Sequence, residues 1–130
     1  MTILFSLLVL VTFNGVPARC LVDTGASHTV ISQELAGQVP GLTPALMTTQ
    51  LVTASGAPMT GAVHLVPTAN TEYFRWRDAL VVVVPSSALA QGWSCILGLN
   101  LLAQQPVLFD WRNAEIRPVA PDVVAAPSDV

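Results

Sequence analysis

The chain has 130 residues, of which 52% are hydrophobic and only 10% are charged, and its formal net charge is −3. This length fits one domain with a substantial core but is small for a two-lobed enzyme. The chain has no lysine and its five arginines are scattered, so we expect no nucleic-acid partner. So few charges cover an isolated monomer poorly, which favours burial of surface against a partner, including a second copy.

Residues 3–13 are almost all apolar and allow three interpretations. The run is too short for a membrane span, and we expect no membrane partner. A signal peptide cleaved near 16–18 has an apolar region here, but no Lys or Arg precedes it. We prefer a strand buried on both faces, because Asn14-Gly15 supplies a hairpin turn into a second strand at 18–22. We expect a cytoplasmic protein, and an exported protein with a cleaved N-terminus is the alternative.

The second strand leads into Leu21-Val22-Asp23-Thr24-Gly25-Ala26-Ser27. This pattern predicts a buried strand that ends at Asp23 and a sharp turn at Gly25, where a missing Cβ permits positive φ or close approach. Such a turn holds Asp23 at the floor of an apolar cavity, where a carboxylate is either paired or functional. Taken alone, Asp-Thr-Gly is also an ordinary turn tripeptide.

A short β-branched strand at 29–31 follows, and Ser32 is placed to cap a helix at 33–39 that ends at Pro40-Gly41. Within 45–67, two strand-like runs surround a tip of small residues at 55–58. A long hairpin of this kind can open and close over a site, although a plain surface hairpin explains it equally well.

The rest of the chain predicts short strands and a second motif. The expected elements are an edge strand within 70–77, a buried strand at 79–84, a loop or helical turn at 86–93, and a hairpin of strands 107–111 and 114–119. Between them, Cys95 to Leu102 repeats the first motif's design, with an apolar strand, Gly98, and a short helix starting near Asn100. Trp76 and Tyr73 are expected to be packing residues.

With both motifs present, the chain resembles the retropepsins, the single-domain aspartic proteases of retroviral type and their cellular and bacterial relatives. The resemblance covers about Phe5 to Val119 and rests on four features: the hairpin into Leu21–Ala26, the strand 29–31, the Gly56 hairpin at the place of the family's flap, and Ile96–Leu102. It implies an all-β, closed barrel or sandwich with one or two short helices, functional as a homodimer. We expect this domain to span 1–119, followed by a disordered Pro/Ala-rich tail at 120–130.

The resemblance also implies an aspartic endopeptidase that acts on a peptide or protein substrate without a cofactor or metal. Each chain has one Asp-Thr-Gly, so Asp23 of two chains would meet on a twofold axis and share a proton. One carboxylate would activate a water and the other would protonate the scissile carbonyl. Thr24 would brace the pair and Gly25 would let the substrate backbone approach. The expected substrate-binding residues, most of them apolar or small, are Leu21, Ala26, Ser27, Val30, Ser55, Gly56, Ala57 and Ile96.

Some residues depart from the viral pattern. Ser27 and Leu99 stand where viral members commonly carry an acidic residue and an arginine, so the ion pair that braces the viral dimer is absent. Pro58 is expected to stiffen one side of the hairpin tip. A non-catalytic dimerisation or peptide-binding module with the same fold is the alternative function.

The four Cys and His residues show no metal-ligand spacing. We expect His28 and His64 to be surface or packing residues. Cys20 and Cys95 each lie three residues before Asp23 and Gly98, on strands that the family places close together. The resemblance therefore allows a disulfide, but we expect two free, buried thiols.

Overall fold

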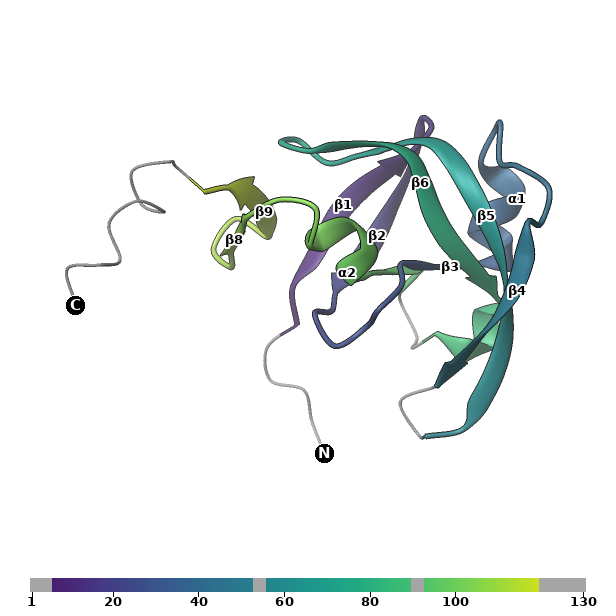
Figure 1. Ribbon diagram of the computed structural model, residues 1–130. Helices are drawn as coiled ribbons and strands as arrows, with labels where there is room; N and C mark the ends of the chain where they lie inside the picture. Colours follow the sequence, from purple (N-terminus) through teal and green to yellow (C-terminus); the bar gives the residue numbers. More distant parts are fainter. Residues whose placement is uncertain (1–5, 53–55, 90–92, 120–130) are drawn as a thin grey trace.

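The structure, a computed structural model, describes residues 6–52, 56–89 and 93–119 (Figure 1). The tail predicted at 120–130 and the tip residues 53–55 lie outside the described residues. In chain order the elements are β1 (Leu8–Phe13), β2 (Val16–Val22), β3 (Val30–Ser32), α1 (Gln33–Gln38), β4 (Met47–Val52), β5 (Pro58–Asn70), β6 (Arg75–Val84), a 3-10 turn (Ser86–Ala88), β7 (Cys95–Leu97), α2 (Leu99–Leu102), β8 (Val107–Asp110) and β9 (Glu115–Pro118).

Six strands close into a barrel. The main sheet has the order β1-β2-β7-β3-β6-β5-β4, and β1 also pairs with β5 at Phe13↔Ala69, which closes the ring of six strands. β4 lies outside this ring and pairs only with the first half of β5. β8 and β9 form a separate two-stranded sheet. The expected all-β fold with a closed barrel and short helices is confirmed.

The first hairpin forms as the sequence predicts. Asn14 and Gly15 have φ of 46° and 95°, the left-handed conformations of a two-residue hairpin turn. β1 is not buried on both faces, however: Val9, Val11 and Phe13 face the core, whereas Leu10 is 60% exposed. One face of β1 points out of the barrel, so this part of the expectation is wrong.

Other elements also follow local signals. Ser32 caps α1, accepting a hydrogen bond from the Leu35 N–H at 3.1 Å, as predicted. The segment from Arg75 to Val84, in contrast, is one strand rather than an edge strand and a separate buried strand. Its first half pairs only with β5 and its end also pairs with β3, so both predicted environments occur along one element.

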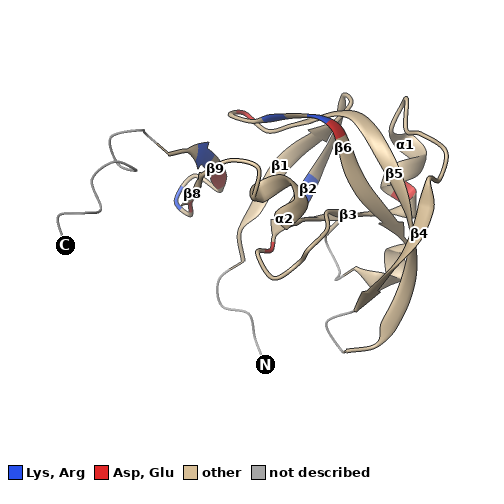
Figure 2. Ribbon diagram, in the orientation of Figure 1, with Lys and Arg blue, Asp and Glu red and all other residues tan. Residues whose placement is uncertain are grey.

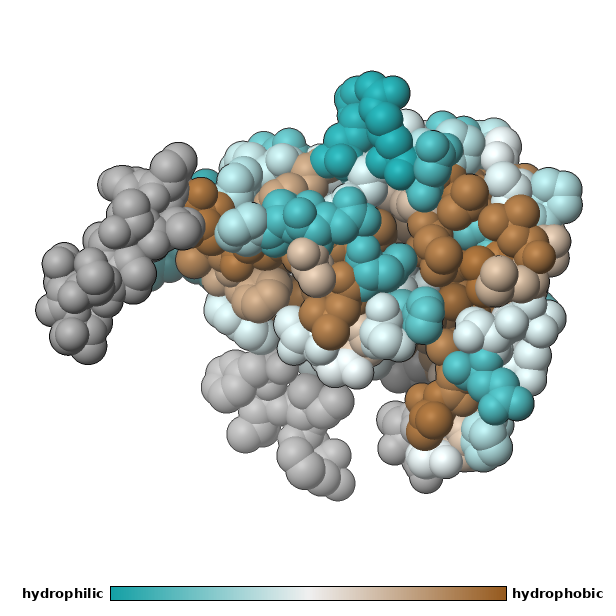
Figure 3. Space-filling view, in the orientation of Figure 1, coloured by the Kyte–Doolittle hydropathy of each residue, from teal (hydrophilic) through white to brown (hydrophobic). Residues whose placement is uncertain are grey.

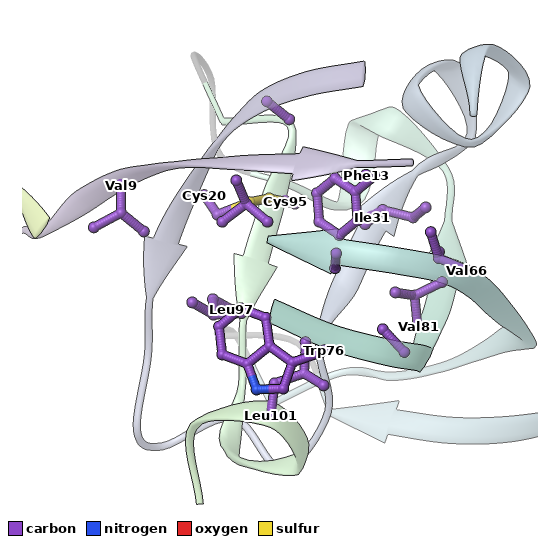
Figure 4. Packing of buried hydrophobic residues seen from close by; sticks show 14 of the residues in the cluster. Val9, Phe13, Cys20, Ile31, Val66, Trp76, Val81, Cys95, Leu97 and Leu101 are labelled. Carbon is purple, nitrogen blue, oxygen red and sulfur yellow. A yellow bond between two sulfur atoms is a disulfide. The ribbon is translucent and has the colours of Figure 1, made fainter. Parts of the chain in front are cut away.

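The barrel interior is a continuous apolar core (Figure 4). Alternate residues of the strands point inward, which is the period-2 pattern that a half-buried sheet requires. Trp76 is buried in this core, as expected, and packs in a stacked arrangement against Phe74. Tyr73 is 39% exposed, and Arg117 of β9 lies over its ring at 4.8 Å.

Cys20 and Cys95 form a disulfide inside this core (Figure 4), so the prediction of two free thiols is wrong. The cysteines face each other on the parallel strands β2 and β7, with Cα atoms 4.6 Å apart. That separation lies within the range that disulfides accept. The strand register decides the pairing, and the register was not predictable from the sequence. Both residues are fully buried, as predicted.

We expect the disulfide to contribute strongly to stability, because it joins residues 75 positions apart in the sequence. Replacing Cys20 and Cys95 together with Ala should lower the free energy of unfolding by about 2–5 kcal/mol, measured by urea denaturation. A thiol reductant should destabilise the parent chain and leave the double variant unchanged. Equal stability of parent and variant would contradict the prediction. The same comparison shows whether the fold persists in a reducing compartment.

Charged residues gather away from the barrel wall that β4 and β5 form (Figure 2). They lie mainly at the start of β6 and in the β8–β9 hairpin, while β4 and β5 contain none. In the hairpin, hydrogen bonds from the side chain and backbone of Asn113 hold the pKa of Asp110 below its ordinary value.

Among the described helices, none has the length and apolar character to cross a membrane.

Candidate active site

Asp23 directly follows β2, where the chain leaves the barrel. Its backbone N–H donates to the Leu97 carbonyl of β7 at 3.1 Å, so the parallel pairing of β2 and β7 fixes its position. A tight turn follows, in which the Ala26 N–H donates to the Asp23 carbonyl at 3.2 Å. Asp23 is half-buried. The strand thus ends at Asp23 as the sequence predicts.

The turn also orients the Asp23 carboxylate. The Gly25 N–H donates to Asp23 Oδ1 at 2.8 Å. A Cβ on Gly25 would lie 3.1 Å from the same oxygen. Of the two reasons predicted for this glycine, positive φ and close approach, the structure supports close approach, because Gly25 does not have a positive φ.

Asp23 opens onto a groove of about 630 Å³, a size typical of ligand sites. The groove is backed by a small apolar cluster of Val30, Val63, Val82 and Val84. Within the described part of the chain, Asp23 is the one acidic residue that lines it. The described residues that line it are Leu21, Asp23, Gly25, Ala26, Ser27, His28, Val30, Gln50, Leu51, Val52, Met59, Val84, Ala88, Leu89, Trp93 and Ile96.

Most of the predicted site residues meet in this groove. Those that line it are Leu21, Asp23, Gly25, Ala26, Ser27, Val30 and Ile96. Thr24 is exposed beside it and is not part of the lining. Gly56 and Ala57 are exposed at the hairpin tip and do not line the groove either, and Ser55 lies outside the described residues.

The β4–β5 hairpin forms one wall of the groove through Gln50, Leu51, Val52 and Met59. Gly56, at its tip, has φ of 87°, a conformation that favours glycine. Apolar surface continues from the barrel toward the free end of this hairpin (Figure 3), and Val52 is 76% exposed there. The strands of the hairpin thus line one side of the groove, and Gly56 is exposed beyond the lining.

A buried hydrogen-bond network fastens the Asp23 loop to α2. Asn100 Oδ1 accepts from the backbone N–H and the hydroxyl of Thr29 at 2.7 and 2.8 Å. Asn100 Nδ2 donates to the Leu80 carbonyl at 2.8 Å, and the Gly98 N–H donates to Thr29 Oγ1 at 3.1 Å. Thr29 is fully buried. The network joins both motifs to β6 and holds the loop from Asp23 to Thr29 in place.

We expect Asn100→Ala to lower the free energy of unfolding by about 2–4 kcal/mol, because it leaves two donors of Thr29 and the Leu80 carbonyl without partners. Chemical denaturation measures this change. Gln104→Ala is the control, since that side chain makes one exposed hydrogen bond and its loss should cost about 0.5 kcal/mol or less. Similar losses for both variants would show that the network contributes little.

The sequence interpretation missed several residues of the site. Asn100 and Thr29 gave a weak signal, since a polar residue after Gly98 and a threonine among apolar residues suggest a buried pair. His28, expected to be a surface or packing residue, is half-buried and lines the groove. Trp93 and the 3-10 turn at Ser86–Ala88 bring further apolar lining that no periodic pattern indicated.

Leu99 lies against the loop that follows Asp23, and a second cavity lies apart from the groove. Leu99, in the place of the viral arginine, is 39% exposed, and its N–H donates to the Ala26 carbonyl at 2.8 Å. A second cavity of about 460 Å³ lies between β1, the β5–β6 turn and the β8–β9 turn, and Asp23 does not line it. The part of the chain that the structure describes holds no cluster of three or more His, Cys, Asp or Glu suited to a metal.

The closed six-stranded barrel is the fold of the retropepsin-like aspartic proteases. The chain belongs to the family described as "gag-polyprotein putative aspartyl protease", which matches residues 9–104. Among solved structures, it is similar to a retropepsin-like aspartic protease from Rickettsia conorii, with a TM-score of 0.56 and 18% identity over 81% of this chain and 76% of that one. At this identity the likeness shows the fold. No curated protein matches the chain significantly.

Proposed function

We propose that the chain is an aspartic endopeptidase that works as a homodimer, with Asp23 of each subunit in one active site. One observation carries the proposal: among the described residues Asp23 is the single acidic one lining the groove, and its carboxylate is held in place by the Gly25 N–H. Hydrolysis by this class of chemistry needs two carboxylates, one as base and one as acid. A second copy of the chain supplies the other.

In the proposed mechanism the two Asp23 carboxylates share a proton, because like charges at close range do not both ionise. The ionised carboxylate takes a proton from a water between them, and the water oxygen attacks the scissile carbonyl. The protonated carboxylate gives its proton to the carbonyl oxygen, which yields a tetrahedral intermediate without a covalent bond to the enzyme. Collapse of the intermediate breaks the C–N bond. The amine takes the proton that the first carboxylate had gained from water, and a hydroxyl of the intermediate returns a proton to the second carboxylate.

The surroundings of Asp23 support the remaining roles. Thr24 and Gly25 are exposed beside the groove, where a second subunit can reach Thr24 and a substrate backbone can reach Gly25. The lining is mainly apolar, which favours apolar side chains next to the cut bond. We assign the β4–β5 hairpin as a flap that closes over the bound peptide and excludes water.

Dilution tests the proposal. Hydrolysis of apolar peptides at mildly acid pH should show a specific activity that falls as the protein is diluted, in parallel with loss of the dimer in sedimentation. A hydroxyl-containing peptide that mimics the tetrahedral intermediate should inhibit. Flat specific activity with only monomer present would overturn the dimeric site. A dimer that binds the inhibitory peptide but cuts nothing would favour the non-catalytic binding module.

A further inference from the structure

Among the described residues that line the groove, one has a basic side chain. His28 lies on the loop from Asp23 to Thr29, and it is half-buried. The chain has no lysine, and none of its five arginines lines the groove. Apart from Asp23, the polar side chains of the lining are the short hydroxyl of Ser27, the amide of Gln50, the indole N–H of Trp93 and the imidazole of His28. The groove is therefore apolar with a single imidazole at a defined place.

The structure holds this imidazole in position. Ser27 Oγ and His28 Nδ1 lie 2.8 Å apart in a hydrogen bond, which occupies one ring nitrogen. The backbone on both sides of the ring is also fixed. The His28 carbonyl packs closely against Gly98, and the next residue, Thr29, is bound by Asn100. The other ring nitrogen, Nε2, makes no hydrogen bond to another described residue. Among the described residues, Nε2 is thus left available for a hydrogen bond to a ligand in the groove.

We propose that His28 selects substrates that carry an acidic side chain at the position lying against its ring. Nε2–H donates to the substrate carboxylate, in a charge-assisted hydrogen bond that is stronger than a neutral one. A half-buried donor on a fixed backbone loses little conformational entropy when it binds. In this arrangement Ser27 Oγ–H donates to Nδ1 and the ring proton is on Nε2, so a lysine ammonium at that position would face another donor. The inference rests on the proposed function, because it concerns the substrate of the same groove.

Peptide hydrolysis tests the selection. Peptides with one apolar cleavage site carry Glu, Gln, Ala or Lys, in turn, at each of three positions on either side of the cut. Their ends are acetylated and amidated, so that a side chain provides the sole carboxylate. For the parent chain, kcat/KM at one position should be about tenfold higher with Glu than with Ala, and lowest with Lys. In His28→Ala, the ratio of kcat/KM for the Glu peptide to kcat/KM for the Ala peptide should fall to about one.

Charge reversal separates recognition from structure. His28→Asp should prefer Lys over Glu at the same position, an outcome that loss of structure does not produce. His64→Ala is the matched control, since His64 lies on β5 with Nδ1 2.7 Å from the Thr43 carbonyl oxygen and does not line the groove. For His64→Ala, the ratio of kcat/KM for the Glu peptide to kcat/KM for the Ala peptide should equal that of the parent.

The outcomes distinguish this inference from the proposed function. Hydrolysis without an acidic preference at any position, or a preference that survives in His28→Ala, overturns the inference and leaves the protease assignment intact. Absence of all hydrolysis overturns the protease assignment, and binding of the same fluorescent peptides then decides the inference. Tighter binding of the Glu peptide by the parent than by His28→Ala supports it, and equal or absent binding overturns it.

Discussion

Replacing Asp23 with Asn should abolish peptide hydrolysis, with a fall in kcat of about 10³-fold or more. Asn has nearly the same shape as Asp, and its side-chain oxygen can still accept the Gly25 N–H that Asp23 Oδ1 accepts at 2.8 Å. It can neither take a proton from water nor share a proton with a second carboxylate. Steady-state hydrolysis of an apolar peptide measures the loss, and circular dichroism and sedimentation check that fold and dimer persist.

Glu34→Gln is the matched control for this change. Glu34 is an exposed carboxylate in the first turn of α1 and does not line the groove. Its conversion to an amide should leave hydrolysis unchanged. If the Asp23→Asn chain cuts peptides as fast as the parent, then Asp23 is not the catalytic acid or base, and the proposed function fails.

The same variant reports on the dimer when the two chains are mixed. Each active site of the proposed enzyme needs Asp23 from two subunits, so a subunit with the Asp23→Asn substitution inactivates the dimer that it enters. A ninefold excess of the variant over the parent should lower the parent's activity about tenfold, because subunits pair at random. Unchanged activity in a mixture that exchanges subunits would show that one Asp23 is sufficient for the site.

The fold could be predicted from the sequence where local rules act. Asn14-Gly15 defines a hairpin turn, and Ser32 caps a helix. Asp23 at a strand end and a turn at Gly25 follow from residue types alone, whereas the choice between positive φ and close approach at Gly25 needs the structure. These features depend on neighbours in the sequence, so one chain without relatives is sufficient to identify them.

The rest depends on which distant segments come together. The disulfide needs the parallel register that puts Cys20 opposite Cys95, and 75 positions separate the two residues in the sequence. The hydrogen bond from the Thr29 N–H to Asn100 Oδ1 joins residues 71 positions apart. His28 enters the groove because its loop is fastened at both ends. The closure of the barrel determines the disulfide, the hydrogen bonds between Thr29 and Asn100, and the position of His28. The residue pattern of a single strand does not determine how a barrel closes.

Gly98 is also required by a contact between segments that are distant in the sequence. We expect Gly98→Ala to destabilise the protein severely. Gly98 has ordinary extended backbone angles, φ −106° and ψ −178°, so conformational freedom does not explain it. A Cβ at this position would instead collide with the carbonyl group of His28 and lie 3.0 Å from the Ala26 carbonyl oxygen. Both obstacles are backbone atoms of the Asp23 loop, which cannot rotate away as a flexible side chain can.

The loop must therefore move if Gly98 gains a methyl group, and its movement breaks the hydrogen bonds from the Gly98 and Leu99 N–H groups to Thr29 Oγ1 and the Ala26 carbonyl. We expect the free energy of unfolding to fall by about 3 kcal/mol or more, beyond the usual cost of one added methylene, with loss of hydrolysis because Asp23 lies on the same loop.

Gly37→Ala is the control: the added Cβ meets no atom within 4 Å, and alanine within α1 should raise stability by about 0.5–1 kcal/mol. Opposite signs for the two substitutions in urea denaturation would show that close packing of the two motifs, rather than a general intolerance of added methyl groups, requires glycine at position 98. A Gly98→Ala chain as stable and active as the parent would contradict the tight contact.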